Sequence, residues 1–276
     1  MKRLLSASLS VALTLGSMLA HGQFDHQHGA WTALLKKHIV LLDGGTASQV
    51  RYAGFARDRA ALKSYLETLS KVPLPAFTDW SRPQQMAFLI NAYNAYAIEK
   101  ILTRYPGIRS IWDFGKVFGN PFRDRFFTLL GQESYLDRIE HETLRKPGAY
   151  SEPRVHFAVN CASIGCPMLR EEAYVADRLD AQLEEQTRRF LSDRSRNRFA
   201  DGRLEVSMIF NWFKEDWTSG YRGFEGKGSP LQSREQFFAR YADILADNPE
   251  QQKIIRDQKA EIRHLDYDWG LNDARK

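Results

Sequence analysis

The chain contains only two cysteines among its 276 residues, Cys161 and Cys166, and this small number excludes a miniprotein held together by disulfides. It also lacks internal repeats and any low-complexity linker that would divide it. Hydrophobic residues make up 43% of the chain beside 26% charged residues, a balance that excludes intrinsic disorder and provides apolar material for a core. We therefore predict one globular domain, spanning residues 23–276.

Long apolar runs are scarce as well, and the one that exists lies at the start of the chain. Two basic residues precede an uncharged run of 17 residues, Leu4 to Ala20, which is short and rich in serine for a transmembrane helix. Ala20 and Gly22 place small residues at the −3 and −1 positions of a cleavage site after Gly22. We predict that residues 1–22 are a signal peptide and that the mature protein is periplasmic or secreted, without a transmembrane span.

The chain has little excess of one charge. Its net charge of +5 includes the two basic residues of the predicted signal peptide, so that +3 remains in the mature protein. The densest basic stretch, residues 188–203, also contains Asp193 and Asp201, as expected of a solvated helix end and loop. This pattern predicts no nucleic-acid partner, and it leaves attraction to an anionic envelope surface open.

The spacing of apolar residues predicts more helices than strands. The clearest helix begins after Ser81, a capping residue, has Pro83 in its first turn and ends before Pro106. Because the predicted strands fall mostly in the second half of the chain, we predict an α+β fold that is mostly helical around a small, largely antiparallel sheet. The predicted helices cover residues 31–39, 57–69, 82–105, 135–145, 175–191, 211–217 and 234–246, and the predicted strands residues 49–55, 126–130, 154–161, 204–209 and 262–269.

Both cysteines lie in one loop of small residues that follows the predicted strand 154–161. A cysteine at the end of a strand is exposed enough to act as a nucleophile, and it normally needs a histidine as base. His156 precedes Cys161 by five residues, an odd offset that puts the two side chains on opposite faces of an ideal strand. His141 could reach Cys161 only through a tertiary contact. Both histidines therefore stay candidates for the base.

Two other states of the cysteines compete with a reactive thiol. Export would expose them to an oxidising compartment, in which Cys161 and Cys166 could form a disulfide that closes a small loop. They could also be inert, buried small hydrophobes. The sequence has none of the short ligand spacings of structural zinc sites, no Gly-rich phosphate loop and no G-x-S-x-G elbow, so we predict neither a metal nor a cofactor.

Four sequence blocks follow one another along the chain. They are Phe88 to Ala95; Ile139-Glu140-His141 with Leu144-Arg145; His156-Phe157-Ala158 with Asn160-Cys161-Ala162 and Cys166-Pro167; and Phe210 to Phe213 with Asp216-Trp217. In order and spacing these blocks resemble the family known as domain of unknown function 547. The resemblance covers roughly residues 50–217, and bacterial members of the family are often exported. Plant relatives can have serine at the position of Cys166, which favours Cys161 as the functional thiol, and they also vary at the Glu140-His141 pair.

The resemblance and the residue types together give two hypotheses for function. The first is a cysteine-dependent hydrolase or transferase that acts on an amide, a peptide or a thiol-containing small molecule. Its residues are the nucleophile Cys161, the base His141 or His156, the orienting carboxylate Glu140, and the substrate contacts Asn91, Asn94 and Asp216. The alternative is a non-enzymatic periplasmic ligand-binding or structural module, whose Asn, His and Trp residues line a ligand groove and whose cysteines are structural. Under either hypothesis, the two asparagines could instead be buried structural amides that tie the long helix to neighbouring backbone. The oligomeric state stays open.

Overall fold

The computed structural model describes residues 24–115 and 119–274, so the predicted signal peptide, residues 1–22, lies outside the described residues. The helices are α1 (Gly29–His38), α2 (Tyr52–Arg57), α3 (Arg59–Ser70), α4 (Leu74–Asp79), α5 (Arg82–Leu102), α6 (Leu136–Ile139), α7 (Leu179–Ser192), α8 (Ile209–Trp212), α9 (Arg234–Arg240), α10 (Ala242–Leu245) and α11 (Pro249–Arg256). The strands are β1 (Ile39–Leu42), β2 (Ala47–Val50), β3 (Phe127–Leu129), β4 (Gln132–Ser134), β5 (Arg198–Ala200), β6 (Arg203–Ser207) and β7 (Glu261–Leu265). No helix within the described ranges is long and apolar enough to cross a membrane.

The strands form small separate sheets rather than one. β1 pairs with β2 and β3 with β4, both antiparallel. β6 is the central strand of a three-stranded sheet, in which β5 is antiparallel to it and β7 parallel, with Leu204 opposite Ile262. The predicted α+β fold is therefore confirmed, but its β structure is divided among three places.

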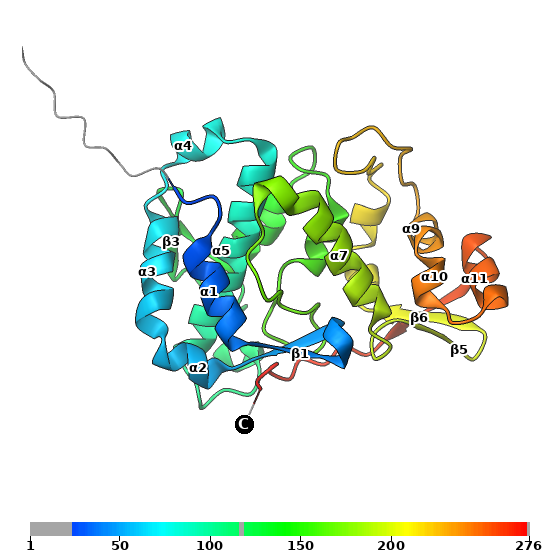
Figure 1. The fold of residues 1–276 in the computed structure, drawn as a ribbon, viewed down its shortest axis with the longest axis horizontal. Helices are drawn as coiled ribbons and strands as arrows, with labels where there is room; N and C mark the ends of the chain where they lie inside the picture. The colour runs from blue at the N-terminus through cyan, green and yellow to red at the C-terminus, as the bar shows by residue number, and fades with distance from the viewer. Residues whose placement is uncertain (1–23, 116–118, 275–276) are drawn as a thin grey trace, which may run out of the picture.

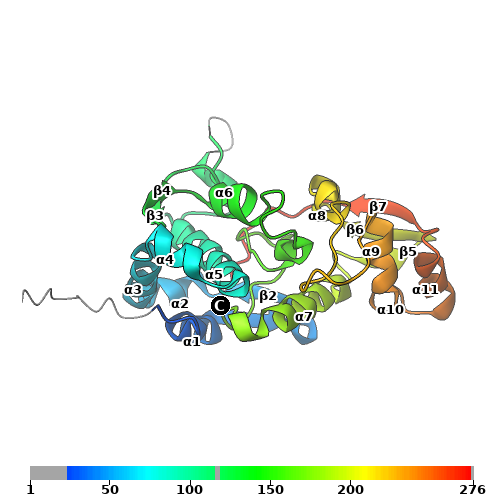
Figure 2. The ribbon, with the colours of Figure 1, turned by 90° about the horizontal axis from the view of Figure 1, so that it is seen from above.

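Two hydrophobic clusters form the interior. One includes side chains of α1, α2, α3 and α5, and the other includes side chains of β6, α8, α9, α10 and α11. In Figure 1 the helices of the first cluster lie on the left, and β6, α9, α10 and α11 lie on the right. Seen from above, α5 runs through the middle of the first group (Figure 2). Ser81 and Gln84 cap its start reciprocally, and nearly all of its residues from Met86 onward are buried. A helix buried on all sides must satisfy its polar side chains within the protein.

The predicted strand over residues 154–161 is wrong. Pro153–Phe157 forms a 3-10 helix whose start is capped by the Glu152 side chain, and the chain then continues without a strand partner. Proline in the first turn and an acidic cap favour this local structure over an extended one. The predicted strand 49–55 is also too long, because β2 ends at Val50 and α2 begins at Tyr52.

The last residues of the chain, 266–274, form what we call the C-terminal strap. In Figure 1 this red segment runs from the β6 side of the molecule past β1 towards α2. Leu271 forms a β-bridge with Ser163, and Asp273 forms one with Val50. The backbone N–H groups of Ile164 and Gly165 donate to strap carbonyls at 2.7 and 2.8 Å. The strap therefore ties the loop of the two cysteines to β2.

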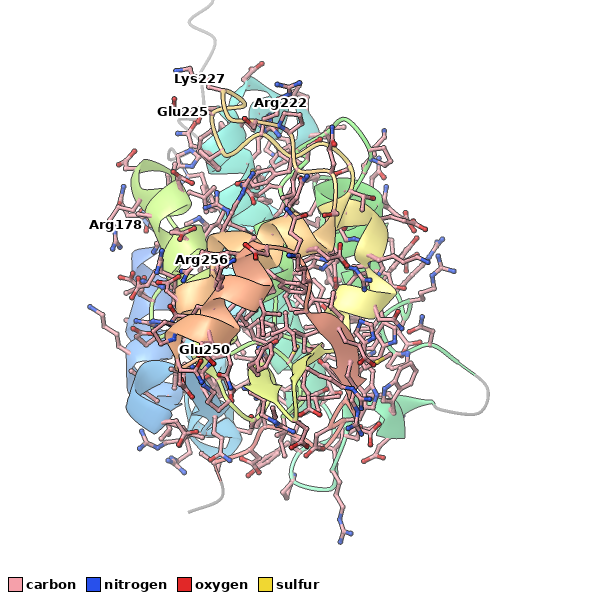
Figure 3. The ribbon with its side chains drawn as sticks, turned by 90° about the vertical axis from the view of Figure 1, so that its right-hand side faces the viewer. Arg178, Arg222, Glu225, Lys227, Glu250 and Arg256 are labelled. Atoms are coloured by element: carbon pink, nitrogen blue, oxygen red, sulfur yellow. The ribbon has the colours of Figure 1, made fainter. Side chains whose placement is uncertain are left out.

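The side of the molecule formed by α9, α10 and α11 carries charges of both signs. Figure 3 labels four basic and two acidic residues there, all of them exposed. Lys227 and Glu225 are paired at 2.8 Å. This mixture agrees with the charge pattern of the sequence. The labelled residues are Arg178, Arg222, Glu225, Lys227, Glu250 and Arg256.

The contact between the strap and the cysteine loop leads to a prediction about Gly165. A Cβ at this position would lie 2.9 Å from the backbone N of Asp268, closer than a real contact allows. Gly165→Ala should therefore lower the free energy of unfolding by about 1–3 kcal/mol, a cost typical of overpacking. The measurement is denaturant unfolding. Gly107→Ala is the control, because its Cβ would meet only a carbonyl at 3.4 Å; equal stabilities of the two variants would contradict the prediction.

Candidate active site

A cavity of about 280 Å³ opens between the two hydrophobic clusters. The predicted residues Glu140, His141, His156, Cys161 and Cys166 all line it. Aromatic rings in mutual contact form another part of its lining, and they come from segments far apart in the sequence. These rings are Trp112, Phe122, Trp212, Tyr267 and Trp269.

Asparagine side chains hold the backbone of the cysteine loop. Asn94 of α5 donates to the carbonyl of Ala158 at 2.9 Å and accepts from the N–H of Asn160 at 2.8 Å. Asn160 in turn donates to the carbonyl of Pro167 and accepts from the N–H of Ala162. Ala162 has a φ of +66°, a left-handed conformation that is unfavourable for alanine. These hydrogen bonds therefore hold the loop in a backbone conformation that is unfavourable at Ala162.

The sulfur of Cys161 lies among hydrogen-bond donors. Its Sγ is 3.2 Å from the Tyr267 hydroxyl, 3.3 Å from Ser163 Oγ and 2.7 Å from Cys166 Sγ. Burial disfavours the thiolate, but hydrogen bonds from Cys166, Ser163 and Tyr267 outweigh it and lower the pKa of the Cys161 thiol. Cys161 is therefore the more acidic of the two cysteines, and it is partly exposed to the cavity.

Cys166 lies behind Cys161 as seen from the cavity and is only 5% exposed. Burial, together with the hydrogen bond to Cys161 and the negative charge there, raises the pKa of the Cys166 thiol well above its ordinary value. Both cysteines are free thiols in this structure. The disulfide that the sequence allows would require the two sulfurs to approach to about 2.05 Å.

Asp216 anchors a cluster of charged and imidazole groups in and beside the cavity. The Arg145 guanidinium donates to both of its oxygens, at 2.6 and 3.2 Å, and His156 Nε2 lies 2.7 Å from Oδ2. Burial opposes ionisation, yet hydrogen bonds from His156 and Arg145 lower the pKa of Asp216 to about 2. Burial lowers the pKa of His156, so its ring is neutral at neutral pH and donates Nε2–H to the carboxylate.

His141 is held in the same tautomer by a different contact. Arg145 donates to its Nδ1 at 2.7 Å, so the proton of the neutral ring is on Nε2, which lies 3.6 Å from Asp137 Oδ1. Burial lowers the pKa of His141. Its side chain is 34% exposed, whereas that of His156 is 1% exposed, so His141 is the more accessible imidazole.

Glu140 stands between the two rings. Its Oε1 is 3.9 Å from His156 Nδ1 and 4.0 Å from His141 Nδ1, and it is hydrogen-bonded to Tyr93. Burial raises the pKa of Glu140. The sequence predicts Glu140 as the carboxylate that orients the imidazole and Asp216 as a substrate contact. In the structure, Asp216 makes the shorter contact with the His156 ring.

The structure brings the predicted residues together in two groups that share one cavity. Cys161 and Cys166 form the thiol group, while Glu140, His141 and His156 form the acid–base group with Asp216. Among the described residues, the hydrogen-bond partners of Cys161 Sγ are Ser163, Tyr267 and Cys166, and none is an imidazole. The histidines therefore face the space in which a substrate would lie rather than the sulfur itself.

Three predicted residues, Asn91, Asn94 and Asp216, do not belong to the cavity lining. Asn91 is fully buried. Its side-chain amide accepts from the backbone N–H of Tyr174 at 3.0 Å and donates to the carbonyl of Tyr174 at 2.7 Å. Asn94 is 2% exposed and is bonded in the same way to the cysteine loop. This geometry matches the structural alternative for both residues. No cluster of three or more His, Cys, Asp or Glu in the described part of the chain could hold a metal ion.

The sequence reasoning missed three residues of the site. Tyr267 donates to the Cys161 sulfur from a position 106 residues further along the chain. Arg145 and Asp137 contact His141. Arg145 belongs to the second of the four sequence blocks, and that block was the one signal that could have identified it.

The fold and the cavity define an α+β protein with a thiol pair facing an imidazole and carboxylate cluster. Residues 77–191 match the model of the family described as protein of unknown function, DUF547. The matched region includes the thiol pair, Glu140, His141 and His156, whereas Asp216 lies beyond it. No curated protein and no solved structure matches the chain.

The two asparagines allow a matched test of what holds the cysteine loop. Asn91→Ala and Asn94→Ala each leave a buried backbone N–H and carbonyl without partner, so each should lower stability by about 2–5 kcal/mol. Only Asn94 contacts the cysteine loop, so only Asn94→Ala should change the alkylation rate of Cys161 in the folded protein. Rates that change equally in both variants would show that Asn94 has no local role.

Proposed function

We propose that the protein is a cysteine-dependent hydrolase or transferase whose nucleophile is Cys161. The observation that supports this most strongly is the position of Cys161 in the cavity, with the hydroxyls of Ser163 and Tyr267 and the thiol of Cys166 hydrogen-bonded to its sulfur, all three of which can donate to a thiolate. These bonds stabilise a thiolate, which is the nucleophilic form of cysteine. A thiolate prepared in this way needs no histidine to remove its proton.

The acid–base group then acts on the substrate. His141 is neutral, carries its proton on Nε2 and lines the cavity, so this N–H can donate a hydrogen bond to the negative charge that develops when the thiolate attacks a carbonyl carbon. Water supplies the proton that the leaving group takes up, and the hydroxide left behind then releases the acyl group from Cys161 as a carboxylic acid and restores the thiolate. Arg145 fixes the tautomer of His141 and the position of Asp216, so it is a positioning residue.

The cavity limits the substrate to a small group. A volume of about 280 Å³ lies at the lower end of the range for small-molecule sites and fits a small molecule or one side chain of a peptide. The aromatic rings favour an apolar or planar group beside the reacting bond. Amides, peptides and thiol-containing small molecules with such a group are the substrate classes of this proposal. The predicted export would place the reaction in the periplasm or outside the cell.

The reactivity of Cys161 with iodoacetamide tests the nucleophile. Only the thiolate is alkylated, so the rate rises as pH rises through the pKa of the thiol. Because the site lowers this pKa, the half-maximal rate should fall at a lower pH than for a small model thiol. Tyr267→Phe removes one donor and should move the midpoint to higher pH, whereas Tyr135→Phe, which loses an exposed bond to Glu142, should not. A midpoint at or above that of the model thiol would refute the proposal.

The role of His141 is tested with an aryl ester and an aryl amide as acyl donors. The wild-type protein should form an acyl adduct on Cys161 that mass spectrometry detects. His141→Leu should slow acyl transfer from the amide by about 10²–10³-fold, the usual loss when one donor to a developing negative charge is removed. His264→Leu is the control, since the His264 ring contacts Arg234 and does not line the cavity. Cys161→Ser should abolish adduct formation, and a retained adduct would place the nucleophile elsewhere.

A further inference from the structure

The two thiols are arranged one behind the other as seen from the cavity. Cys161 is partly exposed, whereas Cys166 is 5% exposed, and their sulfurs are 2.7 Å apart. The loop between them is fixed at Ile164 and Gly165 by the C-terminal strap. A reagent in the cavity therefore meets Cys161 first, and Cys166 is already in position to attack whatever becomes attached to it.

We propose that the protein reduces small, aryl- or alkyl-substituted disulfides by thiol–disulfide exchange, with Cys161 as the attacking thiol and Cys166 as the resolving thiol. The proposal rests on Cys161 as the nucleophile of the proposed function, and it adds a substrate class whose reaction needs no acid–base histidine. The absence of an imidazole among the described partners of the Cys161 sulfur suits this chemistry, because a thiolate leaving group needs little protonation.

The reaction balances with the two protein thiols and one disulfide. The Cys161 thiolate attacks one sulfur of R–S–S–R, which forms a Cys161–S–S–R bond and releases R–S⁻. Cys166 then loses its proton and attacks the Cys161 sulfur, which forms the Cys161–Cys166 disulfide and releases the second R–S⁻. The two protein thiols are oxidised and the substrate disulfide is reduced to two thiols. A separate thiol reductant then reduces the Cys161–Cys166 disulfide and returns both cysteines to free thiols.

The surroundings of the sulfurs make the two steps sequential. Cys166 donates a hydrogen bond to Cys161, and the charge on Cys161 helps to keep Cys166 protonated. When Cys161 becomes part of a mixed disulfide, that charge disappears, and the N–H of Cys161, 2.8 Å from Cys166 Sγ, stays available to stabilise the second thiolate. Formation of the mixed disulfide thus removes one cause of the inertness of Cys166.

The cavity lining favours an aromatic disulfide as probe. Tyr267 contacts both Cys161 and the rings of Trp212 and Trp269, so a ring attached to the attacked sulfur could pack against this aromatic surface. Dithiobis(nitrobenzoate) is such a disulfide, and each exchange step releases one coloured thiolate. We therefore choose it as the test substrate for the folded, reduced, full-length protein.

The wild-type protein should release two equivalents of coloured thiolate and end two hydrogen atoms lighter, with no adduct. Cys166→Ala should release one equivalent and keep one aryl adduct on Cys161, because the resolving thiol is missing. Ser163→Ala is the matched control: it also removes a hydrogen-bond partner of the Cys161 sulfur, but it keeps Cys166 and should still end as the internal disulfide. Thermal unfolding and circular dichroism of each variant show whether it is folded before the assay.

A wild-type protein that keeps one or two aryl adducts would overturn the exchange proposal. If Cys161 in that case is still alkylated with a lowered midpoint, the proposed hydrolase or transferase survives and only the dithiol chemistry fails. If Cys161 reacts neither with the disulfide nor with iodoacetamide in folded protein, both proposals fail together. Release of the first equivalent from Cys161→Ala at the wild-type rate would also overturn the assigned order of the two thiols.

Discussion

The site depends on one constraint, which is that the buried backbone of the cysteine loop has no sheet to satisfy it. Its polar groups are instead bonded by side-chain amides, first by Asn94 and then by Asn160. An unpartnered buried N–H or carbonyl would cost about 1–3 kcal/mol, so these amides decide the path of the loop. Asn94 can serve this purpose because α5 is buried and capped at its start, which fixes the amide relative to the loop.

A second set of bonds couples the loop to the end of the chain. Asn272 in the C-terminal strap donates to Asn160 and accepts from the Tyr52 hydroxyl, so the strap is attached both to the loop and to α2. The same strap carries Tyr267 to the Cys161 sulfur. The acidity of the thiol and the docking of the strap are therefore linked: a change that loosens the strap also removes a donor from the thiolate.

The features that the sequence predicts are those encoded locally. The helix after Ser81 has its cap, its proline and its apolar pattern within one segment, and the structure confirms it. The predicted strand 154–161 failed because the pattern of apolar residues does not reveal that Asn94, 66 residues from Asn160, supplies the bonds a strand partner would supply. Motif blocks identified cavity residues from separate segments, but they could not distinguish Asp216 from Glu140 as the carboxylate nearest to His156. That distinction depends on the distances of the two carboxylates from His156, and tertiary packing sets both distances.

The electrostatics of the cavity separate two kinds of chemistry. Asp216 is ionised across the physiological range because its pKa is about 2, and it fixes the proton of His156 on Nε2. The remaining nitrogen of His156, Nδ1, lies 3.9 Å from Glu140, whose pKa is raised by burial. The Cys161 thiol, by contrast, is polarised by the hydroxyl, thiol and backbone groups around its sulfur. A carbonyl substrate would draw on both groups, whereas a disulfide would draw only on the thiols, so the acid–base group decides which substrates the same nucleophile can process.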